Sequence, residues 1–226
     1  MKLNFLHWLG QSTEDWRDVI DELPTANTLP ISLFSGISNT DSVNLNILNK
    51  NVSAVLDDLN EPYILCGLSL GSVLVLQQAI RKKPLLKGII VSAAQFESPN
   101  KILLTIQDLI FRLMPEGSYR NMNITKRQII ELVHSLRYLK LKDELSKVTI
   151  PSLIICGSKD RINLSASKQL SKIMNQSSLK IIPNGGHELN REQPGEYAKA
   201  INEFLVNRKF PVKMWIYLLR ESFIIK

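Results

Sequence analysis

The stretch Tyr63–Lys82, YILCGLSLGSVLVLQQAIRK, combines a short apolar run with a longer helical pattern. The run before Gly67 is typical of a buried strand, and Ser72–Lys82 has the apolar spacing of a helix. The motif between them is G-x-S-x-G, in which two glycines remove the crowding around a serine in a sharp turn. Such a turn exposes the hydroxyl of Ser69 at a helix start, where backbone amides favour negative charge. Ser69 is therefore the candidate nucleophile, with a plain Gly/Ser turn as the alternative interpretation.

Short apolar runs and helical patterns also alternate on both sides of this stretch. The predicted strands are Leu3–Leu6, Ile31–Phe34, Tyr63–Cys66, Gly88–Ser92, Leu153–Cys156 and Leu179–Ile182. The predicted helices between them are Val43–Leu59, Ser72–Lys82, Ser165–Met174 and Gly195–Val206. Strands that alternate with helices imply right-handed crossovers and a mostly parallel sheet. The predicted fold class is thus α/β, with a sheet of about six strands flanked by helices.

One long segment, Pro99–Lys147, interrupts this alternation because it has no convincing strand. Its helical patterns lie at Ile102–Met114, Lys126–Leu136 and Leu139–Leu145. We predict that 99–147 is a helical insertion after the fourth strand, between the core segments 1–98 and 148–206. The remaining segment, 207–226, is a C-terminal tail rich in apolar and basic residues.

A serine hydroxyl is a weak nucleophile without a base, and the chain contains three histidines. His187 follows the last predicted strand in a glycine-rich loop, whereas His134 lies inside the insertion and His7 follows the first strand. Asp160 comes shortly after the fifth predicted strand. Because ligands bind at the carboxyl ends of parallel strands, Ser69, Asp160 and His187 are expected at one sheet edge. There they can form a catalytic triad in which His187 is the base and Asp160 orients it.

Acyl transfer also needs two backbone amides that hold the developing negative charge. Leu70, the residue after the candidate nucleophile, is the expected first donor. The loop after the first strand, His7-Trp8-Leu9-Gly10, should supply the second donor, and we assign it to Leu9. The plain interpretation of His7 is a residue that only supports this turn.

The composition is that of an ordinary globular protein and argues against several classes. The chain has 226 residues, of which 44% are hydrophobic and 22% charged, which suits one domain with a continuous core. Its net charge of +7 is not concentrated in a long basic run, so we expect no nucleic-acid partner. The apolar start, Met1–Leu9, is too short for a signal peptide, and no stretch reaches membrane-spanning length.

Cys66 and Cys156 each end a predicted strand. We expect both to be reduced core thiols of a cytoplasmic protein, because a disulfide would need the two strand ends at bonding distance. No Cys/His cluster has metal-ligand spacing, so neither a metal nor another cofactor is expected.

Four segments carry a family resemblance: Leu6–Gly10 with Trp16, Gly67–Gly71, Gly157–Asp160, and Gly186-His187 followed by Glu192-Gln193-Pro194. Together they resemble the α/β-hydrolase superfamily, in particular its small esterase branch with a lid, and the triad order Ser-Asp-His agrees. The resemblance implies that the family's leading strands are missing and that the insertion forms a lid over Ser69. It also exposes a departure, because Trp8 replaces a glycine that is usual in the oxyanion loop. A bulky side chain there would narrow the pocket or shift the Leu9 amide.

This resemblance implies a serine hydrolase that cleaves a carboxylic ester or a related acyl bond through an acyl-enzyme. Carbon–carbon bond hydrolysis and a pyruvate-eliminating synthase reaction use the same scaffold and stay open as alternatives. A non-catalytic ligand receptor is a third hypothesis. The expected substrate-binding residues are Trp8, Phe111, Met114 and Tyr138, whose side chains favour an apolar acyl group on a small-molecule substrate.

The tail contains a continuous apolar run, Trp215–Leu219, among basic residues. Soluble monomers rarely expose so much contiguous apolar surface. We predict that 207–226 packs against the chain's own body or against a second copy in a homodimer. Contact with a membrane surface is the less favoured alternative.

Overall fold

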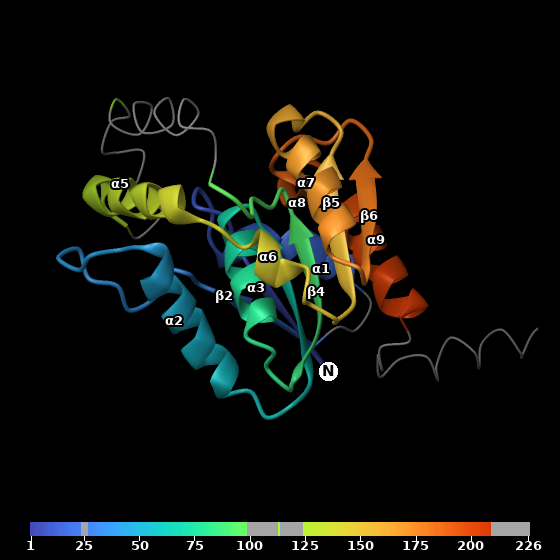
Figure 1. Ribbon diagram of the computed structural model, residues 1–226, viewed down its shortest axis with the longest axis horizontal. Helices are drawn as coiled ribbons and strands as arrows, with labels where there is room; N and C mark the ends of the chain where they lie inside the picture. Colours follow the sequence, from blue (N-terminus) through green and yellow to red (C-terminus); the bar gives the residue numbers. More distant parts are fainter. Residues whose placement is uncertain (24–26, 99–112, 114–123, 209–226) are drawn as a thin grey trace, which may run out of the picture.

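Six parallel strands form one sheet in the order β2-β1-β3-β4-β5-β6 within the residues that the computed structural model describes, which are 1–23, 27–98, 113 and 124–208 (Figure 1). The strands are β1 (Lys2–Leu6), β2 (Asn27–Ile31), β3 (Tyr63–Leu68), β4 (Leu86–Ser92), β5 (Ser152–Gly157) and β6 (Ser177–Ile182). All neighbouring strands run parallel, so every strand directs its carboxyl end to the same edge. The predicted α/β fold class is confirmed.

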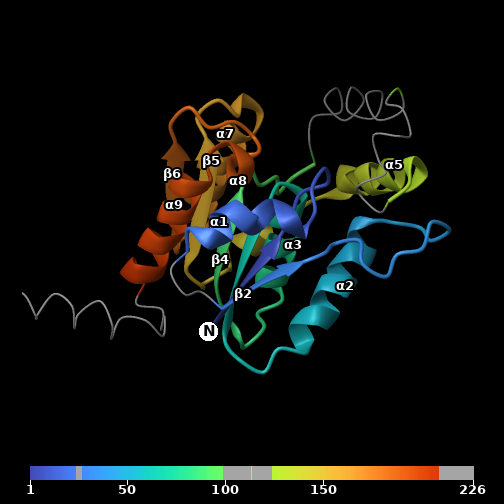
Figure 2. The same ribbon diagram turned by 180° about the vertical axis from the view of Figure 1, so that it is seen from behind.

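Helices cover both faces of this sheet, as the views from opposite sides show (Figure 1, Figure 2). One face carries α2 (Leu45–Asp57), α3 (Leu70–Ile80) and α7 (Arg161–Ile173), and the other carries α1 (Arg17–Asp21) and α9 (Pro194–Asn207). The side chains of β3 alternate between the two layers, since Leu65 belongs to the first core cluster and Cys66 to the second. Both faces of β3 are thus buried, which explains its continuous apolar run.

The second strand lies earlier in the chain than predicted. Asn27–Ile31 pairs with β1, and the pairing ends at Leu6 and Ile31. Leu33 and Phe34 then form a turn, although their side chains are only 1% and 4% exposed. The predicted strand over 31–34 was wrong because these apolar turn residues pack into the core and imitate a strand.

Two short segments were not predicted. The 3-10 helix η1 (Thr13–Trp16) begins with a capping box between Ser12 and Asp15 and continues into α1. Trp16 is fully buried in the cluster that also contains the apolar side of α9. The other short segment is the helix α8 (Leu189–Glu192), which leads from the loop after β6 into α9.

Part of the predicted insertion lies within the described residues. It contains α5 (Lys126–Ser135), the 3-10 helix η3 (Leu136–Tyr138) and α6 (Lys142–Leu145). The predicted helix Ile102–Met114 falls outside the described residues, apart from Leu113. Glu97, which precedes the predicted insertion, forms an antiparallel bridge with Lys140 inside it.

The helix α5 docks on the segment that precedes α2 (Figure 1). The buried Gln128 amide donates to the carbonyl oxygens of Ser38 and Asp41 at 2.7 and 3.0 Å. Glu131 accepts a hydrogen bond from the backbone N–H of Val43 at 3.1 Å. This part of the insertion therefore has its own polar contacts with the core.

Nothing in the described part of the chain forms a helix long and apolar enough to cross a membrane. Of the tail, only Asn207 and Arg208 are described, so its predicted packing stays a prediction. Cys66 and Cys156 are both buried and carry free thiols.

Candidate active site

The turn after β3 holds Ser69 in a backbone conformation that non-glycine residues rarely adopt. Ser69 has φ 52° and ψ −109° and immediately precedes α3. A Cβ on Gly67 would lie 2.5 Å from the carbonyl carbon of Gly71, and a Cβ on Gly71 would lie 2.2 Å from the carbonyl oxygen of Leu6. Both positions therefore require glycine, which is the physical reason for the G-x-S-x-G spacing.

A second serine, Ser72, ties this turn to the end of β4. Its hydroxyl lies 2.7 Å from the carbonyl oxygen of Gly67 and accepts the backbone N–H of Ser92 at 2.8 Å. The backbone N–H of Ser69 donates to the carbonyl of Ser92 at 2.8 Å. Ser72 is fully buried, whereas Ser69 is only half-buried, so Ser69 presents the accessible hydroxyl.

Asp160 follows β5 and caps α7. Its Oδ1 accepts the backbone N–H of Asn163 at 3.3 Å, and α7 therefore begins at Arg161 rather than at the predicted Ser165. Burial raises the pKa of the Asp160 carboxyl, but hydrogen bonds from His187 and Asn163 outweigh burial and leave the pKa below its usual value. Asp160 is thus an ionised acceptor at neutral pH.

His187 lies in the loop between β6 and α8, beside Asp160. Its Nδ1 donates to Asp160 Oδ2 at 2.8 Å, because an ionised carboxylate can only accept. This bond leaves Nε2 as the ring nitrogen available for a proton from a substrate or a nucleophile. Ser69, Asp160 and His187 all follow strands at their carboxyl ends, which places them at the edge where the sequence predicted them.

The loop that carries His187 packs closely on the end of β5. A Cβ on Gly157 would lie 2.3 Å from the carbonyl oxygens of both Gly185 and Gly186, so only glycine permits this approach. The Glu192 carboxylate accepts the backbone N–H groups of Gly186 and Glu188 at 2.6 and 2.9 Å. These two amides flank His187, and the carboxylate therefore holds the loop on both sides of the imidazole.

Two amide side chains behind Asp160 were not predicted. Asn163 Nδ2 lies 2.9 and 2.8 Å from the two oxygens of the Asp160 carboxylate. Gln95, in the loop after β4, donates from Nε2 to Asn163 Oδ1 at 2.6 Å. The spacing Asp-x-x-Asn at a helix start is a capping pattern, and it was the signal that could have indicated Asn163.

His7 supports the loop after β1. The backbone N–H of Leu33 donates to His7 Nε2 at 3.2 Å, so Nδ1 carries the proton and donates to the carbonyl of Trp8 at 2.8 Å. Burial lowers the pKa of His7, which is 1% exposed, and keeps the ring neutral. The contacts thus tie β1, the following loop and the turn after β2 together.

The two expected oxyanion donors belong to the loop after β1 and to the turn after β3, whose backbones approach each other at Gly71. Leu70 is the first residue of α3, so its backbone N–H has no preceding carbonyl within the helix. Leu9 follows Trp8 in a tight turn, because the backbone N–H of Gln11 donates to the Trp8 carbonyl at 3.2 Å. Both leucine side chains are buried in the same core cluster, which positions their backbones without involving the side chains in chemistry.

Trp8 contacts the candidate base directly. Its ring lies 5.5 Å from that of His187, centroid to centroid, in an edge-to-face arrangement at 90°. A Cβ on Gly10 would lie 2.5 Å from the Trp8 ring, so the glycine allows the indole to fold back over the loop. Trp8 therefore lies beside His187, and its predicted role in substrate binding stays a prediction.

A reciprocal amide pair joins the Trp8 loop to the His187 loop. Gln11 Nε2 donates to Asn190 Oδ1 at 3.0 Å, and Asn190 Nδ2 donates to Gln11 Oε1 at 2.9 Å. The two side chains are 3% and 0% exposed. Arg191 pairs with both Asp15 and Glu188 at the rim of the same contact. Sequence reasoning missed this connection, because nothing local relates residues so far apart in the chain.

Of the remaining predicted substrate-binding residues, only Tyr138 is among the described residues. Phe111 and Met114 lie outside the described residues. Tyr138 is 84% exposed and lines a cavity of about 260 Å³ with Asn44, Gln77 and other residues near the start of α2. His134 lies near the end of α5.

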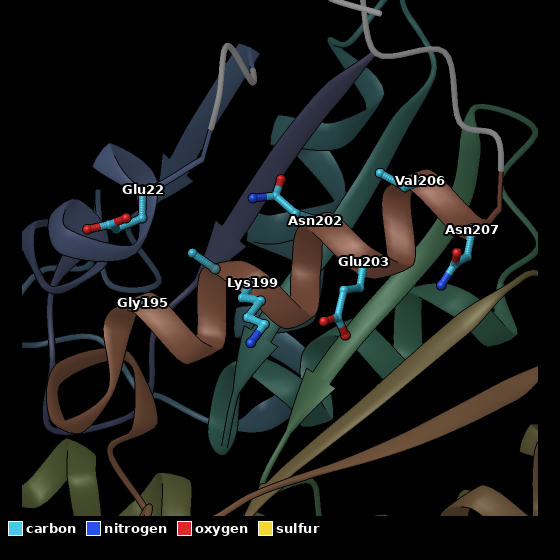
Figure 3. A pocket seen from close by; sticks show the side chains of 8 residues that line it. Glu22, Gly195, Lys199, Asn202, Glu203, Val206 and Asn207 are labelled. Atoms are coloured by element: carbon cyan, nitrogen blue, oxygen red, sulfur yellow. The ribbon is translucent and has the colours of Figure 1, made fainter. Parts of the chain in front are cut away.

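A larger pocket, of about 450 Å³, lies on the outer side of α9 (Figure 3). Its lining includes Glu22, Lys199 and Glu203, and its described lining residues include no member of the predicted triad. Across the described ranges, no group of three or more His, Cys, Asp and Glu side chains could hold a metal ion.

The sequence of the chain is similar to that of several known enzymes. A monoacylglycerol lipase of Mus musculus is 27% identical over 139 residues, which are 57% of this chain and 39% of the relative. The chain thus spans well under half the length of that relative. A putative 2-succinyl-6-hydroxy-2,4-cyclohexadiene-1-carboxylate synthase of Haemophilus influenzae is 25% identical over 247 residues, covering 89% of this chain and 96% of the relative.

Solved structures share the fold at low identity. MenH from S. aureus has a TM-score of 0.78 and 16% identity, covering 92% of this chain and 94% of its own. An enol-lactonase from Burkholderia xenovorans has a TM-score of 0.79 and 15% identity, covering 91% of each chain. A family model described as "Alpha/beta hydrolase family" matches residues 5–200. Since that match spans most of the sequence, the chain belongs to the alpha/beta hydrolase family.

Proposed function

We propose that the chain is a serine hydrolase that cleaves a carboxylic ester or a related acyl bond. The observation that carries the proposal is the 2.8 Å hydrogen bond from His187 Nδ1 to the buried Asp160 carboxylate. It belongs to the sheet edge at which the strained turn presents Ser69. This arrangement supports a nucleophile, a base and an acid in the roles that acyl transfer requires.

In the proposed reaction, Ser69 Oγ attacks the acyl carbon while its proton passes to His187 Nε2. The backbone amides of Leu9 and Leu70 stabilise the oxyanion of the tetrahedral intermediate. His187 then returns the proton to the leaving alcohol, and the acyl group stays on Ser69. A water molecule, deprotonated by His187, attacks the acyl-enzyme; His187 then returns the proton to Ser69 Oγ as the acyl–Oγ bond breaks and the carboxylic acid is released. Asp160 stabilises the imidazolium in both halves of the reaction.

The core cluster that includes the start of α3 is apolar and favours an apolar acyl group. Leu9, Phe34 and Val73, from the loops after β1 and β2 and from α3, belong to one core cluster. The inward face of α5 contributes Ile129 and Leu132 to the same cluster. We therefore expect an apolar acyl group, since burial of hydrocarbon contributes roughly 0.8 kcal/mol per methylene.

A series of p-nitrophenyl esters of increasing acyl length tests this function. The expected result is hydrolysis by the wild-type chain with a rise in kcat/KM as methylenes are added, and no hydrolysis by Ser69→Ala. Hydrolysis by Ser69→Ala within about tenfold of wild type would reject Ser69 as the nucleophile.

Two other reactions on the same scaffold stay as alternatives: elimination by a synthase and hydrolysis of a carbon–carbon bond. One observation favours the synthase. The Haemophilus influenzae relative, named as a putative synthase, aligns with 89% of this chain. Assaying the product named for that relative would separate the two reactions. Formation of that product without ester hydrolysis would favour the synthase.

A non-catalytic ligand receptor is the remaining alternative, since the Trp8 indole contacts His187 where the family usually has glycine. A receptor would bind an acyl compound without turnover. Ester turnover lost in Ser69→Ala would argue against it.

A further inference from the structure

The carboxylate of Asp160 has a second polar partner besides His187, which is Asn163. Asn163 contacts the carboxylate through two donors: its backbone N–H donates to Oδ1 at 3.3 Å, and its side-chain Nδ2 lies 2.9 and 2.8 Å from the two oxygens. The Asn163 side chain is 6% exposed, so this contact is shielded from solvent. The backbone N–H alone completes the helix cap, which leaves the side-chain amide free for another role.

The orientation of the Asn163 amide follows from its neighbours. The carboxylate offers only acceptors, so the group that faces it must be the donating Nδ2. On the other side, Gln95 Nε2 donates to Asn163 Oδ1 at 2.6 Å and prevents the amide from turning over. Asn163 Nδ2 also lies 3.2 Å from His187 Nδ1, so both donors converge on Asp160 Oδ2.

The position of Gln95 depends on a strained turn at the end of β4. Ala93 has φ 51°, which non-glycine residues rarely adopt, and its backbone N–H donates to the Ile155 carbonyl at 3.2 Å. This turn directs the following residues across the end of β5 toward α7. The strained residue, Ala93, thus lies two residues before the glutamine that binds Asn163.

We infer that Asn163 is a positioning residue of the proposed serine hydrolase, with Gln95 fixing its amide, an assignment that rests on that proposed function. Asn163 holds the Asp160 carboxylate in the rotamer that presents Oδ2 to His187. It also keeps the carboxylate ionised while His187 carries a proton. Without the Asn163 amide, the carboxylate can rotate about its side chain, and the imidazole loses the partner that orients it.

Other titratable groups near the pair do not duplicate this role. The Cys156 thiol lies close to Asp160, and burial, then the carboxylate's charge, raises its pKa. Glu188, next to His187 in the chain, pairs with Arg191 at 2.9 Å. Lys159 and Arg161 flank Asp160 in the chain, and both are exposed.

The chain offers a matched control for substitutions at Asn163. Near the C-terminal end of α3, Gln78 Nε2 donates to Asn49 Oδ1 at 2.5 Å, and Asn49 is also 6% exposed. Both pairs are glutamine–asparagine amide pairs with an equally buried asparagine, but the Gln78–Asn49 pair joins α2 to α3, whereas the other pair contacts Asp160. Asn49→Leu therefore measures the cost of losing a buried amide without disturbing the proposed triad.

The first readout is the His187 Nδ1–H resonance at neutral pH, recorded on histidine-labelled protein and assigned with His187→Gln. We expect Asn163→Leu to shift this resonance upfield or broaden it, and Asn49→Leu to leave it unchanged. The second readout is ester turnover, in which Asn163→Leu should lower kcat about 10- to 100-fold with KM nearly unchanged. Asn163→Ser keeps a donor and should retain more activity. Gln95→Leu should have a smaller effect that does not add to that of Asn163→Leu.

A folded Asn163→Leu with the wild-type resonance and kcat within about twofold would overturn the positioning role. If Asn163→Leu does not fold, the half-buried Gln95→Leu decides, since a wild-type resonance there would also overturn it. A wild-type chain that fails to react with a fluorophosphonate would reject the hydrolase instead, and the resonance comparison would still support or overturn the Asn163 contact.

Discussion

The loops after β3, β5 and β6 and the loop after β1 border the same site but are built differently. In the first group, backbones approach so closely that Gly67, Gly71 and Gly157 have no room for a Cβ. In the loop after β1, side chains determine the geometry, since Trp8 packs on His187 and the Gln11 amide binds a partner loop. The close backbone approaches leave a glycine spacing in the sequence, whereas the contact of Gln11 with Asn190 leaves no local pattern.

This difference explains where sequence reasoning succeeded. Glycine spacing is local, and it predicted the turn at Ser69 and the loops of Asp160 and His187 at one edge. Contacts between side chains distant in sequence, such as Gln11 with Asn190, depend on the complete fold. Substitutions of the closely packed glycines and substitutions in the loop after β1 should therefore have effects of different type and size.

The largest expected effect comes from the base. His187→Ala should lower kcat/KM for esters by about 10⁴-fold or more, because no other group would accept the proton of Ser69. His134→Ala is the control and should retain most activity. Initial rates with a p-nitrophenyl ester measure both. Inactivation by His134→Ala with an active His187→Ala would assign the base to α5.

Gly157→Ala tests the close packing of backbones at the sheet edge. The added methyl would meet the carbonyl oxygens of Gly185 and Gly186 at 2.3 Å and displace the His187 loop. We expect a loss of about 1–3 kcal/mol in the free energy of unfolding, together with reduced kcat. Gly195→Ala is a matched control, since no atom lies within 4 Å of its Cβ position. Urea denaturation compares the two variants, and equal stabilities would contradict the packing account.

Trp8→Ala tests the loop in which side chains set the geometry. Removing the indole should leave the fold intact and open space beside His187. We expect kcat/KM to change by about tenfold, rising for bulky acyl groups relative to short ones. The ratio of rates for a branched and a linear acyl ester is the measurement. An unchanged ratio would show that Trp8 does not border the acyl pocket.

The smallest expected effect concerns His7, whose pKa burial lowers from 6.5. Below that pH the unfolded chain binds a proton that folded His7 does not, so stability falls as the pH drops toward the lower folded pKa. Tm measured against pH should therefore decline less steeply below pH 6.5 in His7→Gln than in wild type. The other two histidines are common to both proteins and cancel in the comparison. If the curves of Tm against pH for wild type and His7→Gln were parallel, burial would not hold His7 neutral.

Two elements, β2 and α7, were predicted with wrong bounds, and contacts outside the local pattern explain both differences. Leu33 and Phe34 were predicted as strand because their side chains are buried, but only pairing with β1 decides where β2 ends. The start of α7 was missed because Asp160 was considered only as a catalytic acid and not also as a helix cap. Local patterns thus indicated the elements and the loops that carry the predicted triad, whereas a contact from another loop, such as that of Gln95 with Asn163, could be seen only in the fold.

The central claim is that the turn after β3 presents a nucleophilic serine that the His187–Asp160 pair activates. Incubation with a fluorophosphonate followed by peptide mass spectrometry tests it most directly, with wild type, Ser69→Ala and His187→Ala compared. The account predicts one adduct on Ser69 in wild type, none in Ser69→Ala and greatly slowed labelling in His187→Ala. An unlabelled wild type, or labelling of another residue that persists in Ser69→Ala, would contradict it.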